Sequence, residues 1–363
     1  MADVTAAMVK ELRDLTGAGI MACKNALVEN DGDMDKAVEA LRKSGEAKAV
    51  KKASRIAAEG IVKVLVDGNT AVVVEVNSET DFVAKNEKFQ NFVTEVAKQI
   101  ATGNAKDVEG LLAEPWAAEP EKTVNDALIN MIATIGEKMT IRRFEKVVSD
   151  GVLVPYIHGG GRIGVLVEAD CENNEANQEA LKNIAMQVAA MNPEYITRDD
   201  MSQEALDKLK EITVESALNT PDTLPKPILL KLIARACDEK VWSDEDIAIY
   251  GEQKNNMNYL FNFLSDEAKT QLAGLANQDR DTITTDKIFV GAVEGRFAKQ
   301  LKEICLVDQV YVKAEDGKQS VGAYLKGVDA NLKLKKFIRF ETGEGIQKKE
   351  ENFAEEVAKQ MNQ

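Results

Sequence analysis

The sequence has only one histidine, His158, and four cysteines that are scattered along its 363 residues. A single histidine excludes a metal site built from several imidazoles, and no two cysteines have the CxxC spacing of zinc or redox sites. We expect the four thiols to be reduced and buried, as scattered cysteines are in a reducing compartment. These absences argue against an enzyme that relies on histidine or thiol chemistry.

Long apolar segments, a leader pattern and an excess of positive charge are also missing. No run approaches the roughly 20 apolar residues of a membrane span, and the first residues, MADVTAAMVK, lack the basic and apolar regions of a signal peptide. We therefore expect a cytoplasmic protein without a membrane partner.

Acidic residues outnumber basic ones by 61 to 46, which argues against broad binding of nucleic acid. A chain of this length predicts two to four domains.

The first 54 residues predict a small three-helix domain. Three apolar stripes with helical spacing occur within residues 5–44, separated by glycine-containing breaks, and Asp33 is placed to cap the third helix. Residues 42–55 then carry six basic residues and one acidic residue. We interpret this basic segment as a solvated linker or a fraying helix, and a binding patch is the alternative.

Two segments of the chain share one pattern of hairpin and helix. Residues 61–76 are two β-branched runs around a DGN turn at 67–69, and a helical pattern follows them. Residues 151–190 repeat this order, so that Glu75 of the first copy aligns with Glu168 of the second. A hairpin covered by one helix is not stable by itself, and we expect the two copies to pack as halves of one α+β core.

The remaining segments are mostly helical in pattern. Residues 105–149 and the acidic stretch 203–300 predict helices, whereas strand patterns return at 307–314 and 334–341. An amphipathic helix is expected at about 350–361. We predict five parts: the three-helix domain and basic linker at 1–54, the first core half at 55–149, the second core half at 150–200 and 301–345, an inserted helical region at 201–300, and a C-terminal helical module at 346–363.

A glycine cluster, HGGGR at residues 158–162, comes nearest to a catalytic motif. It resembles the oxyanion loop of some esterases, but those enzymes need a GxSxG nucleophile motif, which the sequence lacks. Phosphate-binding glycine motifs are absent too. The simpler interpretation is a hairpin turn whose glycines adopt positive φ, with His158 exposed at its tip for contact with a partner. A hydrolase that uses His158 is a competing hypothesis.

The segment NSETDFVAKN, residues 77–86, places an acid and an aromatic side by side where a strand gives way to a helix. One interpretation makes Asp81 the N-cap of that helix and Phe82 a core residue. However, the following helix has an apolar stripe of its own, so Phe82 is not needed to complete it. The other interpretation is an aromatic wedge that enters a partner, beside an acid suited to disturbing a metal ion or its water shell.

Five motifs occur in order along the chain: LRDLTGAGIMACKNAL, ETDFVAKNEKF, YIHGGGRIGVLVE, AVEGRF and FIRFETGEGIQKKEENFAEEV. With them the sequence resembles the bacterial elongation factor Ts family, the guanine-nucleotide exchange factors of the translation GTPase elongation factor Tu. The resemblance implies a ubiquitin-associated-like (UBA-like) N-terminal domain, a core of two related halves, a helical hairpin inserted in the second half, and a C-terminal helical module. It also implies a protein that is not an enzyme and needs no cofactor or metal of its own.

The resemblance further implies which residues bind elongation factor Tu, in its GDP-bound and nucleotide-free states. The family's TDFV segment inserts near the switch region and magnesium site of the GTPase, and the factor does not touch the nucleotide. The N-terminal domain grips the nucleotide-binding domain, and the core hairpin tip contacts the third domain. The matching residues are Thr80, Asp81, Phe82 and Val83 for the first role, Arg13, Ile20 and Met21 for the second, and His158 and Gly159 for the third.

The sequence departs from the family's pattern in three places. Ile20 and Ser78 stand where methionine and cysteine are common, and both changes are mild. The insertion from about 201 to 290 is longer than the family's short antiparallel coiled coil, so several helices, or a small bundle, are expected there. A second hypothesis for the same scaffold is a binding or chaperone module that holds a client without altering nucleotide affinity. Asp81 and Phe82 distinguish the two hypotheses.

Overall fold

The computed structural model describes residues 4–16 and 18–347. The helix expected at 350–361 and most of the predicted module at 346–363 lie outside the described residues. The chain divides into two compact units: one contains the residues up to Asn192 and those from Tyr324 onward, and the other is Pro193–Ala323. The residues expected to bind a partner all belong to the first unit. The finer five-part division stays a prediction.

Three helices open the first unit: α1 (Ala6–Thr16), α2 (Ile20–Glu29) and α3 (Met34–Lys52). Their apolar stripes meet in a small core around Leu12, Cys23 and Leu27. At the start of α3, the Asp33 carboxylate accepts a hydrogen bond from the Lys36 amide at 3.0 Å. The three predicted helices and the predicted cap are confirmed, while the UBA-like arrangement stays a prediction.

The basic segment 42–55 is not a solvated linker, because α3 continues through it to Lys52. The second half of α3 packs on α7 (Val124–Ile135). Gly45 permits the close approach, since a Cβ atom there would lie 3.3 Å from the Cβ of Ala133. Lys52 also donates a hydrogen bond to the carbonyl of Gly136, just beyond α7. The charge pattern was misleading here because the small residues on the other face of the helix decide its packing.

The first half of the core is an antiparallel sheet of β1 (Glu59–Asp67), β2 (Thr70–Ser78) and β5 (Met139–Val148), in the order β1-β2-β5. The predicted hairpin is confirmed, with Asp67 paired to Thr70 across its turn.

The prediction of helix over 105–149 is wrong for part of that range. α6 (Val108–Ala113) and α7 are helical, but β3 (Pro115–Trp116) and β4 (Glu119–Thr123) form a small hairpin, and β5 is the third strand of the sheet. The reason is tertiary: without β5 the second edge of β2 would have unpaired backbone groups.

The second half repeats this plan with β6 (Val152–His158), β7 (Ile163–Asp170) and β8 (Lys333–Glu341), in the order β6-β7-β8. α8 (Glu175–Met191) packs on β6 and β7. The strand predicted at 334–341 is confirmed as β8. The strand predicted at 307–314 is wrong, because that segment contains a short 3-10 helix, η3 (Leu306–Asp308), and only an isolated bridge between Val310 and Ser320. β8 already occupies the free edge of β7 that another strand would need.

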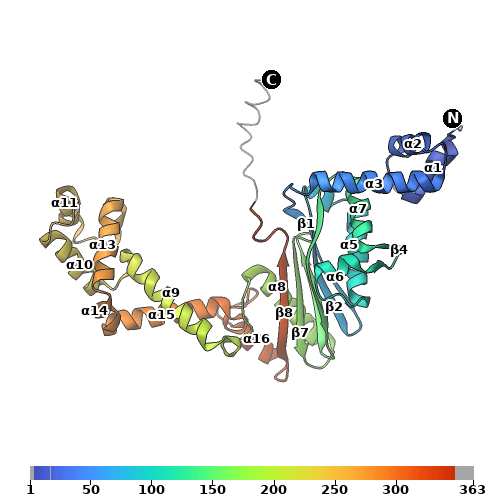
Figure 1. Ribbon diagram of the computed structural model, residues 1–363. Helices are drawn as coiled ribbons and strands as arrows, with labels where there is room; N and C mark the ends of the chain where they lie inside the picture. Colours follow the sequence, from blue (N-terminus) through green and yellow to red (C-terminus); the bar gives the residue numbers. More distant parts are fainter. Residues whose placement is uncertain (1–3, 17, 348–363) are drawn as a thin grey trace. The chain divides into compact units, whose positions relative to one another are not determined.

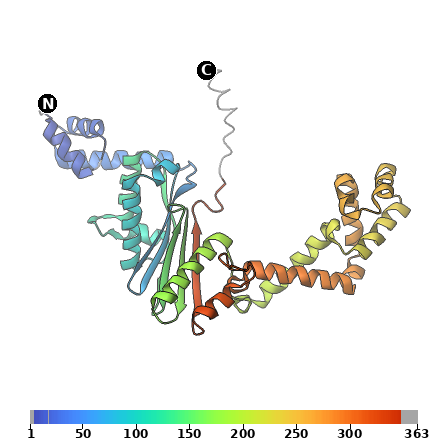
Figure 2. The ribbon, with the colours of Figure 1, turned by 180° about the vertical axis from the view of Figure 1, so that it is seen from behind.

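The two sheets pack face to face, and helices cover their outer faces (Figures 1 and 2). Val62, Val73, Leu166 and Phe340 meet between the sheets. α5 (Glu87–Thr102) and α7 cover the outer face of the first sheet, and α8 covers that of the second. β2 is buried on both faces. Its successive side chains point to opposite sides of the sheet, so that they pack alternately on the covering helices and on the other sheet. The fold class predicted from the sequence, α+β, is confirmed.

The duplication extends to a β-bulge in the third strand of each half. Arg142 is the extra residue of β5 opposite Glu75, and Lys335 is the extra residue of β8 opposite Glu168. A bulge re-aims neighbouring side chains, and both Arg142 and Arg143 reach the Glu75 carboxylate, at 3.0 and 2.6 Å. The two glutamates that align in sequence are therefore equivalent in the structure.

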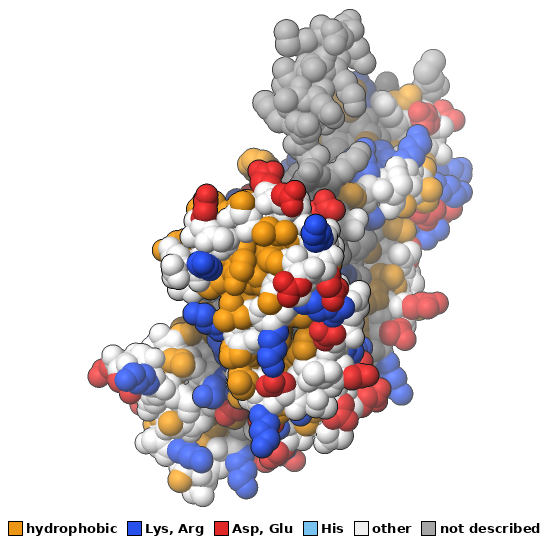
Figure 3. All heavy atoms as spheres, turned by 90° about the vertical axis from the view of Figure 1, so that its left-hand side faces the viewer, with side chains coloured by type: hydrophobic (Ala, Val, Ile, Leu, Met, Phe, Trp, Pro, Cys, Tyr) orange, Lys and Arg blue, Asp and Glu red, His pale blue; other side chains and the backbone are white. Residues whose placement is uncertain are grey.

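The second unit is helical. Its helices are α9 (Gln203–Asn219), α10 (Lys226–Asp238), α11 (Asp244–Gln253), α12 (Met257–Phe263), α13 (Asp266–Gln278), α14 (Arg280–Thr285) and α15 (Lys287–Ile304), with the 3-10 turns η1 (Arg198–Asp200) and η2 (Pro221–Thr223), and α16 (Val321–Val328) begins at its end. They enclose a core that contains Trp242, Leu272 and Phe289. On the face in Figure 3 apolar side chains form a stripe, and Tyr259 and Phe263 are exposed. The several helices expected in the insertion are confirmed.

Candidate partner-binding site

The TDFV segment forms a one-turn helix, α4 (Asp81–Ala84), directly after β2. At the end of β2 the Ser78 hydroxyl donates a hydrogen bond to the Thr80 carbonyl at 3.0 Å. Val83 is buried in the core of the first half, where α4 packs on β1 and β2. After the turn, the Asn86 side chain caps α5 by accepting from the Lys88 amide at 2.9 Å. The segment is therefore fixed on both sides although it is only one turn long.

The Phe82 side chain is 80% exposed, while its neighbour Val83 is only 6% exposed. The interpretation of Phe82 as a core residue is therefore wrong. Phe89, Phe92 and the other apolar side chains of α5 already fill the core beside this turn. An exposed ring on a fixed turn has the apolar area and the limited conformational freedom that suit a contact with a partner.

Asp81 is not the N-cap. Thr80 has that position, with extended backbone, and Asp81 is the first residue of α4. The Asp81 carboxylate accepts a hydrogen bond from Nζ of Lys85 at 2.7 Å, and this bond lowers the pKa of Asp81 below its usual value. The site thus presents an ionised carboxylate beside the exposed ring. Asp81 lies at the N-terminal end of α4, the end of a helix at which negative charge is favoured.

Two acidic side chains that the sequence analysis missed hold the residues just before the turn. The Glu137 carboxylate accepts from the Thr80 amide at 3.1 Å and from the Thr80 hydroxyl at 2.8 Å. The Glu79 carboxylate accepts from the Lys138 amide at 2.5 Å and forms an ion pair with Arg55 at 3.3 Å. The sequence offers little signal for this, because Glu137 follows a helix-ending glycine as any polar turn residue does and lies 57 positions from Thr80.

Arg13, Ile20 and Met21 are all exposed on α1 and α2. Arg13 and Ile20 line one open hollow between these helices, together with Val9 and Lys24. The structure builds this hollow from other elements than those that carry the TDFV segment, whose α4 packs on β1, β2 and α5. The role of Arg13, Ile20 and Met21 in gripping a partner stays a prediction.

His158 is exposed at the tip of the hairpin between β6 and β7. Gly159 and the two glycines after it have positive φ angles of 59°, 67° and 104°, which confirms the interpretation of the cluster as a turn. The Tyr156 hydroxyl lies 3.0 Å from Nδ1 of His158. The third glycine, Gly161, anchors the tip to the other hairpin, since its carbonyl accepts from the Val62 amide at 2.7 Å. The tip is thus a fixed turn that presents an imidazole to solvent.

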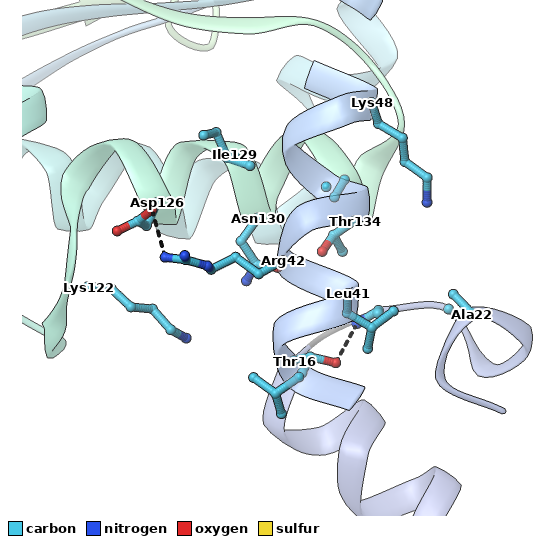
Figure 4. A pocket seen from close by; sticks show the side chains of 15 residues that line it. Thr16, Ala22, Leu41, Arg42, Lys48, Lys122, Asp126, Ile129, Asn130 and Thr134 are labelled. Carbon is cyan, nitrogen blue, oxygen red and sulfur yellow. Dashed lines mark hydrogen bonds and ion pairs between the residues drawn. The ribbon is translucent and has the colours of Figure 1, made fainter. Parts of the chain in front are cut away.

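A small pocket lies between α3 and α7 (Figure 4). Leu41 and Ile129 give it apolar walls, and Arg42 reaches toward Asp126, with 4.0 Å between Nη1 and Oδ1. Its volume of about 100 Å³ is below the roughly 300–1,000 Å³ of sites that hold cofactors or drug-sized ligands. None of the predicted site residues lines it.

The described part of the chain has neither a metal-binding cluster of side chains nor a membrane-spanning helix. Within residues 4–16 and 18–347, no group of three or more His, Cys, Asp or Glu side chains could hold a metal ion. In the same part of the chain, no helix is both long enough and apolar enough to cross a membrane.

Comparison with known proteins decides the family. The family model described as "Elongation factor TS" matches residues 79–245 and 254–344, more than half of the chain. The chain belongs to the elongation factor Ts family. Proteins named "Elongation factor Ts" from Clostridium novyi (strain NT) and Clostridioides difficile (strain 630) are 46% and 43% identical to it; the alignments cover 99% of this chain in both cases, and 99% and 100% of those proteins. The protein of that name from Clostridium tetani (strain Massachusetts / E88) is 41% identical, with 99% of each chain covered.

These elongation factor Ts relatives change one expectation about the insertion. They align with this chain over nearly their whole length, so the long helical insertion is not peculiar to it. The elongation factor Ts model itself begins at Glu79. The TDFV segment and His158 therefore lie inside the region that the model matches, and Arg13, Ile20 and Met21 lie before it.

Proposed function

We propose that this member of the elongation factor Ts family is a guanine-nucleotide exchange factor for elongation factor Tu, acting in the cytoplasm during polypeptide elongation. The observation that carries the proposal is the Phe82 ring, 80% exposed beside the buried Val83. A ring fixed in this way can enter a pocket of a partner while losing little conformational freedom. The exposed and ionised Asp81 carboxylate lies next to it in the chain.

In the proposed mechanism, Phe82 enters between helices of the GTPase near its switch region. Asp81 disturbs the magnesium ion or its water shell, the phosphate-binding loop rearranges, and GDP leaves. A factor that binds the nucleotide-free GTPase more tightly than the GDP-bound form must weaken GDP binding by the same factor. No covalent bond is made or broken, so the chain does not act as an enzyme. Abundant GTP then displaces the factor.

Two further contacts with the same GTPase belong to the proposal. Arg13, Ile20 and Met21 of a UBA-like domain grip the nucleotide-binding domain, which is supported by the exposure of all three side chains. His158 and Gly159 contact the third domain, which is supported by their exposure on a fixed turn.

The test is stopped-flow release of a fluorescent GDP from elongation factor Tu with wild type, Phe82→Ala and Phe263→Ala. Phe263 is a matched control because it is also an exposed phenylalanine, at 56%, but lies in the second unit. A hot-spot aromatic contributes about 2 kcal/mol or more, so Phe82→Ala should slow stimulated release more than about tenfold. Phe263→Ala should leave it unchanged.

Complex formation with the nucleotide-free GTPase is measured on the same variants. We expect Phe82→Ala to weaken binding far less than it slows release. Equal losses in binding and release would contradict the wedge. A wild-type protein that binds without accelerating release would be a holding module, which is the competing hypothesis.

A further inference from the structure

Thr80 immediately precedes the proposed wedge and uses both of its donors on one distant carboxylate. Its amide donates to Oε2 of Glu137 at 3.1 Å and its hydroxyl to Oε1 at 2.8 Å. Thr80 is the N-cap of α4, yet its hydroxyl makes no capping bond to that helix. An N-cap threonine normally spends its side chain on its own helix. We call the two bonds from Thr80 to Glu137 the Glu137 clamp.

The turn that carries Glu137 is itself fixed on both sides. Gly136 ends α7 with a φ of 89°, and its carbonyl accepts a hydrogen bond from Lys52 at the end of α3. Lys138 donates its amide to Glu79 at 2.5 Å and its Nζ to the Arg55 carbonyl at 2.7 Å. Glu137 therefore extends from a held turn, and the clamp transfers that rigidity to the residue before Asp81.

A one-turn helix needs such support. An isolated turn is unstable because nucleation fixes several residues for one backbone hydrogen bond. The side chains of Val83 and Ala84 pack the turn on the core of the first half, but apolar contacts are not directional and do not by themselves fix one orientation of the residues that begin the turn. The clamp adds two directional bonds to a charged acceptor, and these are stronger than neutral ones.

We propose that Glu137 is a positioning residue for nucleotide exchange, which holds Thr80 so that Phe82 is presented in one orientation. The inference rests on the proposed exchange function. Without the clamp the turn samples several orientations. The free energy needed to order the turn when it binds the GTPase then slows stimulated GDP release. Glu137 acts through Thr80 and does not touch the GTPase.

The first experiment compares stimulated GDP release by wild type, Glu137→Ala, Glu137→Gln and Glu87→Ala. Glu87 is the matched control, since it is an exposed glutamate in the first turn of α5, close to the segment in sequence. Losing two bonds to a carboxylate should slow release about tenfold for Glu137→Ala and less for Glu137→Gln, which keeps one acceptor oxygen. Glu87→Ala should behave as wild type. A Glu137→Ala variant that is as active as Glu87→Ala would overturn the proposal.

The second experiment repeats Glu137→Ala in the Phe82→Ala background. A positioning residue has no effect once the residue that it positions is gone, so the double variant should match Phe82→Ala. A further loss of about tenfold in that background would overturn the proposal, because Glu137 would then act by a contact of its own.

A third measurement does not depend on the exchange activity. Amide hydrogen exchange in the free protein should accelerate about tenfold or more in Glu137→Ala at the hydrogen-bonded amides of the turn. These are the amide of Thr80, which donates to Glu137, and those of Lys85 and Asn86, which donate to the carbonyls of Phe82 and Val83. The protection of β5 should stay unchanged. Unchanged protection of these three amides would overturn the clamp, and Glu137→Gln gives a second variant should the alanine variant fail to fold. A wild-type protein that accelerates no GDP release would refute the proposed function, while hydrogen exchange would still decide the clamp.

Discussion

Replacing Glu75 by glutamine should lower the stability of the first unit by about 3 kcal/mol. The buried Glu75 carboxylate accepts from Nη1 of Arg142 at 3.0 Å, from Nε of Arg143 at 2.6 Å and from the Gly343 amide at 2.7 Å. Glutamine has nearly the same shape but no charge, so Arg142 loses its ion pair and Arg143 keeps only the one to Glu344, at 3.0 Å. Breaking a buried ion pair costs about 3–5 kcal/mol. The lower end applies because the two arginine side chains are 27% and 33% exposed.

The duplicated core supplies the matched control for this change. Glu168 has the equivalent position and is also buried. Its carboxylate accepts from the Ser149 hydroxyl at 2.5 Å, but Nζ of Lys335 is 3.8 Å away on a side chain that is 46% exposed. Glu168→Gln should therefore cost only about 1 kcal/mol.

Thermal unfolding followed by tryptophan fluorescence measures both variants. Trp116 lies in the core of the first unit and Trp242 in that of the second, so a Trp242→Phe background reports on the first unit alone. A loss of about 3 kcal/mol corresponds to roughly 6–12 °C in Tm for a unit of this size. Equal Tm shifts for the two variants, or a Glu75→Gln shift below about 2 °C, would refute the reasoning.

The same carboxylate makes stability depend on pH. Burial alone would raise the pKa of Glu75, but hydrogen bonds from Gly343, Asn77 and the two arginines outweigh it and lower the pKa below its usual value of 4.5. Just below that pH the unfolded chain binds more protons than the folded chain, so stability falls as the pH drops through the lowered pKa. The advantage of wild type over Glu75→Gln should be complete above about pH 5 and shrink on acidification.

Two other changes separate what stabilises the fold from what performs its function. Gly343→Ala should cost more than about 2 kcal/mol of unfolding free energy. Gly343 has a φ of 72°, and a Cβ atom added there would collide with a backbone carbonyl. The control is Gly345→Ala, which should cost about 1 kcal/mol, because Gly345 has a similar φ of 74° but open space around it. Equal Tm shifts for the two glycines would contradict this. Removing residues near 228–280, in the inserted helical region, should leave stimulated GDP release mostly intact, since the five quoted motifs lie outside this range. Loss of release in a variant whose first unit unfolds normally would show that the insertion takes part in exchange.

The sequence by itself determined the features that neighbouring residues decide. The DGN turn at 67–69 and the glycines after His158 need particular backbone dihedrals, which are local properties. The apolar stripe of α5 is complete without Phe82, which pointed to an exposed ring, but the structure decided between that interpretation and a core residue. The resemblance to the family followed from five motifs, each a continuous stretch of the sequence.

Tertiary structure alone decided what depends on residues far apart in the chain. Residues 139–148 form β5 because β2 has a second edge that must be paired. Glu137 meets Thr80 across 57 positions, and Arg142 turns toward Glu75 because of the bulge in its strand. The periodic spacing of apolar residues, which predicts helices and strands, does not predict such pairs. They form when packing brings polar groups out of water together, and each group must then find a hydrogen-bond partner.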